Sequence, residues 1–194
     1  EKMANMCSKR ISHSVLNIKG DIYCFGGGDQ TPKFMPNPNV ERYIVKDNKW
    51  EVLKVKNQEC FVPAAHMFAQ LLKDDTEVLI WGGADHDLKT SMTGGFTFDL
   101  RQNEFKVFHQ EFRAPAKSTT DFSDLNTVKD ADYLYFLTPY SSDGKKTAFA
   151  QFTFSFKDRK FEYNGRKYLD NDGRERKTES KSTKMDDSVV SKKQ

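Results

Sequence analysis

The chain has 194 residues and a net charge of +3, with 30% charged, 37% hydrophobic and 13% aromatic residues. This length fits one domain or two small ones, and apolar runs such as residues 78–81 are far shorter than the about 20 residues that cross a bilayer. Before residue 166 the chain holds 22 basic and 22 acidic residues, a balance that argues against nucleic acid or a membrane as partner. With no secretory signal evident, we expect a cytoplasmic protein.

Four short segments rich in aromatic and aliphatic residues make up the first unit of the chain. They are residues 12–16, 22–27, 40–43 and 48–52. Turn-forming sequences such as KGD at residues 19–21 separate them. Short apolar runs between turn formers, without a 3.6-residue period, are typical of consecutive antiparallel strands. We therefore predict a four-stranded antiparallel unit.

The second unit repeats this pattern at a spacing of 56 residues. Residues 78–83 (VLIWGG) align with residues 22–27 (IYCFGG). In the segment that opens this unit, His66 stands at the position that we assign to His13, so we expect a structural role for both. Self-similarity at a fixed period predicts stacked supersecondary units. The other segments of the second unit are residues 95–99 and 103–107.

The third unit is more divergent, and a charged tail follows it. Another step of 56 residues leads to residues 134–139 (LYFLTP), and the weaker segment 122–125 opens the unit. Residues 166–194 hold nine basic, six acidic and one aromatic residue. Such a stretch cannot bury enough apolar area to offset the entropy of ordering, so we predict a disordered tail. The third unit continues with residues 151–154 and 159–163.

Two glycines and two aromatic residues give the first unit a family resemblance. Gly26 and Gly27 end the second segment, Tyr43 follows 16 residues later, and Trp50 follows after seven more. Together with Arg10 before them, these residues resemble the kelch repeat. Kelch units form the four-stranded blades of β-propellers, so the resemblance implies an all-β, kelch-type β-propeller.

The later units keep this pattern in part. The second retains Gly82 and Gly83, whereas the third has Thr138 and Pro139 in their place. Glycine pairs tolerate positive φ and close backbone approach, so we expect both pairs to be structural. Large aromatic side chains can fill the wedge between neighbouring blades. The side chains expected to pack there are Trp50, Phe105 and Phe161.

The resemblance suggests boundaries for each unit. Propellers close with 4 to 8 blades, so three units predict part of a larger ring. Further blades of a longer chain would complete it, and a homodimer of two three-blade sets is the alternative. The expected units are a linker or strand from a preceding blade at 1–11, blades at 12–56, 57–112 and 113–165, and the tail at 166–194.

Catalytic and metal-binding patterns are weak in this sequence. Cys7, Cys24 and Cys60 form no CxxC pair, which argues against a disulfide framework or a zinc site. There is no GxSxG nucleophile motif, and no Lys-Ser/Thr follows the glycines at residues 26–28 to form a phosphate loop. We expect no catalytic residue, no cofactor and no metal. The loop residues Asp85, His86 and Asp87 have the side-chain types of metal ligands, but an ordinary solvated loop is favoured.

The loops that follow the glycine-bearing segments differ most between the units. The first, residues 29–39, holds three of the six prolines. It is expected to expose Phe34 and Met35 as an anchor for a peptide, although both could instead fold back over the blade edge. The candidate partner-binding residues in the three loops are Lys33, Phe34, Met35, Asp85, His86, Asp87 and Tyr140.

These observations predict a non-catalytic scaffold or adaptor. Repeats maintain the fold while loops vary, so we expect a protein or peptide to bind the loops of one face. A metal-dependent oxidase or lyase on the same fold is one alternative. A structural component of the cytoskeleton or axoneme is another, which would imply cytoskeletal association.

Overall fold

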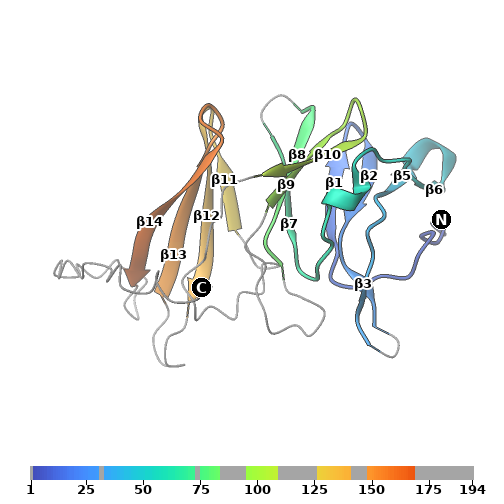
Figure 1. The fold of residues 1–194 in the computed structure, drawn as a ribbon, viewed down its shortest axis with the longest axis horizontal. Coiled ribbons are helices and arrows are strands. Elements are labelled where there is room, and N and C mark those ends of the chain that lie inside the picture. Colours follow the sequence, from blue (N-terminus) through green and yellow to red (C-terminus); the bar gives the residue numbers. More distant parts are fainter. Residues whose placement is uncertain are drawn as a thin grey trace, which may run out of the picture.

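Three four-stranded antiparallel sheets stand side by side in the computed structural model (Figure 1). The structure describes residues 2–30, 33–72, 75–83, 95–108, 126–140 and 148–168. We name the sheets blades 1, 2 and 3 in chain order. The described sheets form no closed ring. Within the same residues, no helix is long and apolar enough to cross a membrane. The predicted all-β fold with four-stranded blades is therefore confirmed.

Each blade contains four strands that pair in chain order, and in blade 1 a separate hairpin comes between the second and the third. Blade 1 contains β1 (Ser14–Ile18), β2 (Asp21–Phe25), β5 (Glu41–Ile44) and β6 (Lys49–Val52). Blade 2 contains β7 (Phe68–Leu71), β8 (Glu77–Trp81), β9 (Gly95–Asp99) and β10 (Glu104–Phe108). Blade 3 contains β11 (Asn126–Lys129), β12 (Tyr133–Tyr140), β13 (Ala148–Ser155) and β14 (Lys160–Tyr168).

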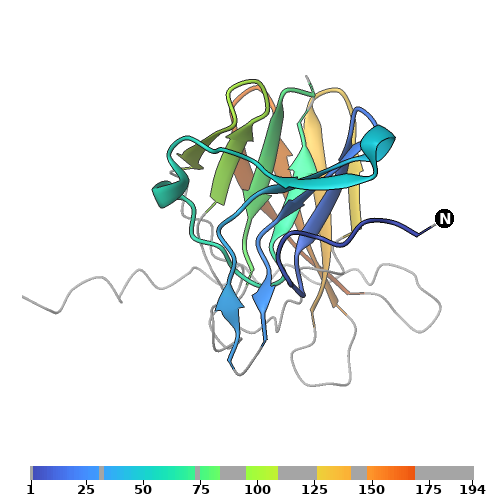
Figure 2. The same cartoon turned by 90° about the vertical axis from the view of Figure 1, so that its right-hand side faces the viewer.

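Shorter elements lie between the strands of the blades. The strands β3 (Gly28–Asp29) and β4 (Met35–Pro36) form a separate two-stranded hairpin after β2. This hairpin projects beyond the end of blade 1 (Figure 2). The 3₁₀ turns are η1 (Val45–Asp47) and η2 (Gln58–Cys60).

Strand register confirms the repeat in the last three strands of every blade. In blade 1, Ile22 pairs with Tyr43, which pairs with Trp50. The equivalent rows are Val78–Phe98–Phe105 in blade 2 and Leu134–Phe154–Phe161 in blade 3. In each row the two aromatic rings touch, with centroids 5.2, 4.9 and 4.9 Å apart.

The first strand of each blade departs from the expected alignment. Ser14 pairs with Phe25 and Phe68 pairs with the equivalent Trp81, so His66 corresponds to Ser12 and not to His13. Ser12 and His66 share a left-handed backbone, with φ of 56° and 55°. The expected equivalence of His13 and His66 is therefore wrong, because the register is set by pairing with the second strand across turns of different length. In blade 3 the first strand is β11, and the predicted segment 122–125 lies outside the described residues.

Two apolar clusters hold the three blades together, and β8 contributes to both. Val78 and Ile80 belong to the cluster shared with blade 1, whereas Leu79 and Trp81 belong to the cluster shared with blade 3. All four are fully buried, which explains why β8 reads as a continuous apolar run. The Trp81 ring stacks on Phe161 with centroids 5.0 Å apart.

The three aromatic residues that were expected to pack between neighbouring blades have different surroundings. Phe161 packs between blades 2 and 3, as predicted. Phe105 stacks at 4.3 Å on Phe61, which lies in the connection between blades 1 and 2. Trp50 packs on Tyr43, and its indole nitrogen donates to the carbonyl of Ala4 at 3.1 Å. The N-terminal segment therefore lies against Trp50.

Both glycine pairs adopt the backbone that was expected of them. Gly26 and Gly27 have φ of 64° and 68°, and Gly82 and Gly83 have φ of 69° and 98°. A Cβ on Gly26 would lie 2.9 Å from the Ala64 carbonyl oxygen at the edge of blade 2. These positions require glycine because the chain turns where two blades meet.

Blade 3 shows what happens when the glycines are absent. Thr138 and Pro139 continue β12, pairing with Ala150 and Phe149 of β13. The strand therefore extends to Tyr140 without the turn that ends β2 and β8. The strand β14, which pairs with β13, continues to Tyr168, past the point where the charged tail was expected to begin, and the rest of that tail lies outside the described residues.

Candidate partner-binding site

Some of the predicted loop residues lie within the part of the chain that the structure describes, and others lie outside it. Lys33, Phe34 and Met35 lie at and beside the start of β4. The backbone of Tyr140 ends β12, the strand that is equivalent to β2. The three residues at positions 85–87, namely Asp85, His86 and Asp87, lie outside the described residues. The hairpin β3–β4 is therefore the part of the predicted surface whose geometry can be followed.

Phe34 lies under the hairpin and is not part of its exposed surface. Only 7% of the residue is exposed, and a Cβ added to Gly28 would lie 3.0 Å from the Phe34 ring. The ring thus covers the backbone of a residue that has no side chain of its own. The expected exposure of Phe34 is wrong, because the apolar ring gains more by covering Gly28 than by facing water.

Met35 and Lys33 remain at the surface. Met35 is 62% exposed, among the highest values for a large apolar residue in the described part of the chain. Lys33 is also exposed. Met35 is held in the β4 strand by its pairing with Asp29, and Pro36 follows it. The hairpin therefore presents one flexible apolar side chain and one cation from a backbone of limited freedom.

Backbone hydrogen bonds attach the hairpin to blade 1. Ile11 and Gly28 exchange two bonds, with N···O distances of 2.8 and 3.1 Å. The amide of Asn37 donates to the carbonyl of Gly27 at 2.9 Å. The Ile11–Gly28 bonds thus attach β3 to the segment before β1, and the Asn37–Gly27 bond holds the two ends of the hairpin to each other.

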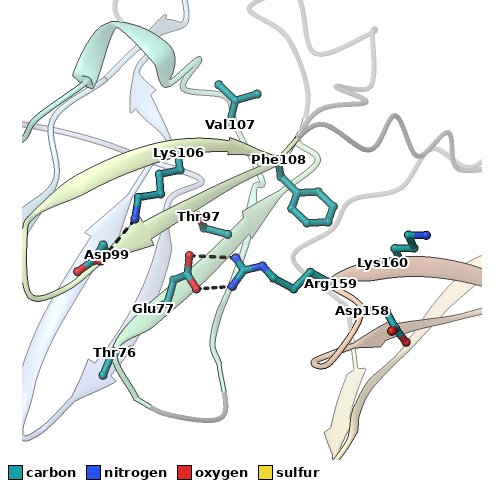
Figure 3. A pocket seen from close by; sticks show the side chains of 10 residues that line it. All are labelled: Thr76, Glu77, Thr97, Asp99, Lys106, Val107, Phe108, Asp158, Arg159 and Lys160. Carbon is teal, nitrogen blue, oxygen red and sulfur yellow. Dashed lines mark hydrogen bonds and ion pairs between the residues drawn. The ribbon is translucent and has the colours of Figure 1, made fainter.

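A hollow, which the sequence analysis missed, lies between blades 2 and 3 (Figure 3). Its volume is about 810 Å³. Arg159 makes a two-pronged ion pair with Glu77, at 2.7 and 3.0 Å, across the hollow. The two residues are far apart in sequence and match no motif, so no sequence signal could have found them. The lining residues are Thr76, Glu77, Thr97, Asp99, Lys106, Val107, Phe108, Asp158, Arg159 and Lys160.

The charges in this hollow largely neutralise one another. Burial raises the pKa of Glu77, but hydrogen bonds from Arg159 and Thr97 outweigh it and hold the pKa below its ordinary value. Lys106 lies 3.7 Å from Asp99. Paired carboxylates and cations of this kind provide neither a general base nor a nucleophile. The Glu77–Arg159 ion pair in this hollow therefore connects two blades and does not form a reactive centre.

Other potentially reactive groups show no assembled site. Burial raises the pKa of the Cys24 thiol to about 11, so this cysteine is protonated at neutral pH. Among the described residues, no three His, Cys, Asp or Glu side chains are grouped so as to hold a metal ion.

Comparison with known proteins agrees with the fold. Residues 9–54 match the family model of the kelch motif, which covers the first unit almost entirely. This match confirms the resemblance of the first unit to the kelch repeat, and the three four-stranded sheets are consistent with the blades of a kelch-type β-propeller. No curated protein sequence matches the chain significantly.

A solved structure covers a larger part of the chain. A fungal alcohol oxidase of the AA5 family, in complex with copper, matches with a TM-score of 0.39 and 13% sequence identity. The match covers 84% of this chain and 45% of the oxidase, so the chain spans less than half of that protein.

Proposed function

We propose that this chain is a non-catalytic protein-interaction module that binds a protein or peptide at the hairpin β3–β4. The observation that carries the proposal is the exposure of Met35 on a hairpin that Phe34, Pro36 and backbone hydrogen bonds hold in place. A backbone that is already ordered loses little conformational entropy on binding. Such a residue is a plausible centre for an interface.

The chemistry of the hairpin suggests what it would recognise. Met35 offers a polarisable, adaptable contact for an aliphatic or aromatic side chain. Lys33, two residues earlier, offers a cation to a carboxylate. We therefore expect a peptide in which an apolar residue lies close to an acidic one.

The connections after β2, β8 and β12 support the choice of this face. The three strands are equivalent in the repeat, so these connections leave the blades at the same end. Residues in such loops are free to vary without disturbing the blades. Binding at the hairpin could therefore extend to the candidates Asp85, His86, Asp87 and Tyr140.

Selection from a random-peptide display library tests the proposal. We expect the intact chain to enrich peptides that share an apolar and an acidic residue. The Met35→Ala variant should bind these peptides about tenfold more weakly, because truncating a central anchor typically costs more than 1 kcal/mol.

The matched control is Val52→Ala, which also truncates an exposed apolar residue, 47% accessible, but on β6 away from the hairpin. This variant should bind the selected peptides as tightly as the parent chain. Equal affinity of the parent and the Met35→Ala variant would refute the hairpin as the binding site. Failure of the folded chain to enrich any peptide family would also count against the proposal.

A further inference from the structure

A fully buried ion pair lies at the base of the hairpin. The Nη2 atom of Arg10 lies 2.6 Å from Oε1 of Glu41, and neither side chain has any exposed surface. The other carboxylate oxygen accepts a hydrogen bond from the Cys7 amide at 2.9 Å. Burying two charges is costly unless the surrounding groups satisfy them, so the position of both side chains is strongly constrained.

The second arm of the guanidinium joins the two ends of the excursion, by which we mean the segment 26–39 that contains the hairpin. Its Nη1 atom donates to the carbonyl of Gly26 at 3.2 Å and to the carbonyl of Asn39 at 3.1 Å. Gly26 directly follows β2, and Asn39 lies two residues before the start of β5 at Glu41. One planar group therefore fixes the departure and the return of this segment to each other and to Glu41 on β5.

Blade 2 has no such pair at the equivalent positions. Glu41 pairs with Cys24, and Phe96 pairs with the equivalent Ile80, so Phe96 takes the place of Glu41. Counting back from the equivalent residues Ser12 and His66, Ala64 takes the place of Arg10. Both replacements are apolar and buried. Packing of blade 2 therefore does not require the ion pair.

We infer that Arg10 is a positioning residue for the partner-binding hairpin. It holds the carbonyls at both ends of the excursion so that Met35 is presented in a fixed direction. Arg10 cannot touch a partner itself, because its side chain is fully buried. This inference rests on the proposed function, but its first readout needs no partner.

The double variant Arg10→Met with Glu41→Leu is the central test. Exchanging a buried ion pair for apolar residues of similar volume is often neutral for stability, and blade 2 already uses an apolar pair. We expect the thermal midpoint to stay close to that of the parent. Hydrogen exchange at the Asn37 amide, which bonds to Gly27, should become about tenfold faster, while amides of the β8–β9 ladder keep their protection.

Binding of the selected peptides gives the second readout. We expect the double variant to bind them about tenfold more weakly, because a loosened hairpin must be ordered at the moment of binding. The single variant Arg10→Lys should show the same direction of change, since one ammonium group cannot reproduce the planar fork. The control is Arg42→Met, which removes a β5 arginine that pairs with Asp21 at the surface and should leave both readouts unchanged.

The outcomes separate this inference from the proposed function. Unchanged exchange at Asn37 in the double variant would overturn the positioning role, whatever the peptides do. Faster exchange with unchanged peptide affinity would overturn it as well, because the hairpin would then not need to be fixed. If Met35→Ala has no effect on binding, the proposed function fails irrespective of Arg10.

Discussion

Gly27 lies where blade 1 turns into its hairpin, and its requirement for glycine can be measured. The residue has a φ of 68°, and an added Cβ would collide with the carbonyl of Ile11 and lie 2.8 Å from the Cβ of His13. We expect Gly27→Ala to lower the free energy of unfolding by about 2–3 kcal/mol, from the left-handed backbone and the collision together. Urea denaturation measures the change.

Gly20 provides the matched control for this substitution. Its φ is 92°, but an added Cβ would meet no atom within 4 Å. Gly20→Ala should therefore cost only about 1 kcal/mol, the backbone contribution alone. Equal losses for the two variants would show that crowding at Gly27 is not what requires glycine there.

His13 couples the stability of blade 1 to pH. Its Nδ1 atom is buried and has no hydrogen-bond partner within the described residues. Burial and the nearby Arg10 charge lower the pKa of His13 below its ordinary value of 6.5, although Glu41 acts in the opposite direction. The unfolded chain therefore takes up the proton more readily than the folded chain, so stability falls as the pH drops through 6.5 towards the lowered value.

Thermal melts between about pH 8 and about pH 5 test this dependence. The His13→Asn variant should lose less stability on acidification than the parent, because it has no group to protonate. The control is His66→Asn, the same substitution at a histidine in the segment that opens blade 2. A parent and a His13→Asn variant with the same pH dependence would contradict the prediction.

At the scale of elements, Trp81 illustrates how a strand joins two blades. It is 1% exposed, stacks on Phe161, and lies at the end of the strand that serves both apolar clusters. We expect Trp81→Ala to cost about 3–5 kcal/mol in the free energy of unfolding, from lost burial and the cavity that remains. Trp50→Ala should cost less, because Trp50 is only partly buried. Chemical denaturation of both variants would contradict this ranking if Trp50 proved the more costly.

Most strands could be predicted because their signal is local. Apolar runs between turn formers placed β2, β5 and β6, and the repeat then placed their equivalents in the other two blades. The first strand of each blade was harder to align, because the turn after it differs in length: two residues separate β1 from β2, and five separate β7 from β8. The length of β12 also escaped prediction, since the consequence of losing two glycines depends on whether β13 can pair with the extension.

At the scale of the whole molecule, contacts between distant residues dominate. The Glu77–Arg159 ion pair joins β8 to the turn before β14, and the Arg10–Glu41 pair joins the N-terminal segment to β5. The serine hydroxyl of Ser14 donates to the carbonyl of Met67, which joins blade 1 to blade 2. The Glu77–Arg159 and Ser14–Met67 contacts have no sequence motif, because each depends on how the blades are stacked.

Part of the candidate site could likewise be predicted from the sequence, and part could be seen only in the structure. The three prolines in residues 29–39 indicated that the segment containing Met35 is part of the site. The burial of Phe34, in contrast, depends on its position over Gly28 and was seen only in the structure. Sequence alone determined the class of fold, the units and the residues that repeat, because hydrophobic spacing and turn chemistry act over a few neighbouring residues. Tertiary structure alone decided which loop residues face water and which buried charges hold them, because burial depends on segments that meet only when the blades pack.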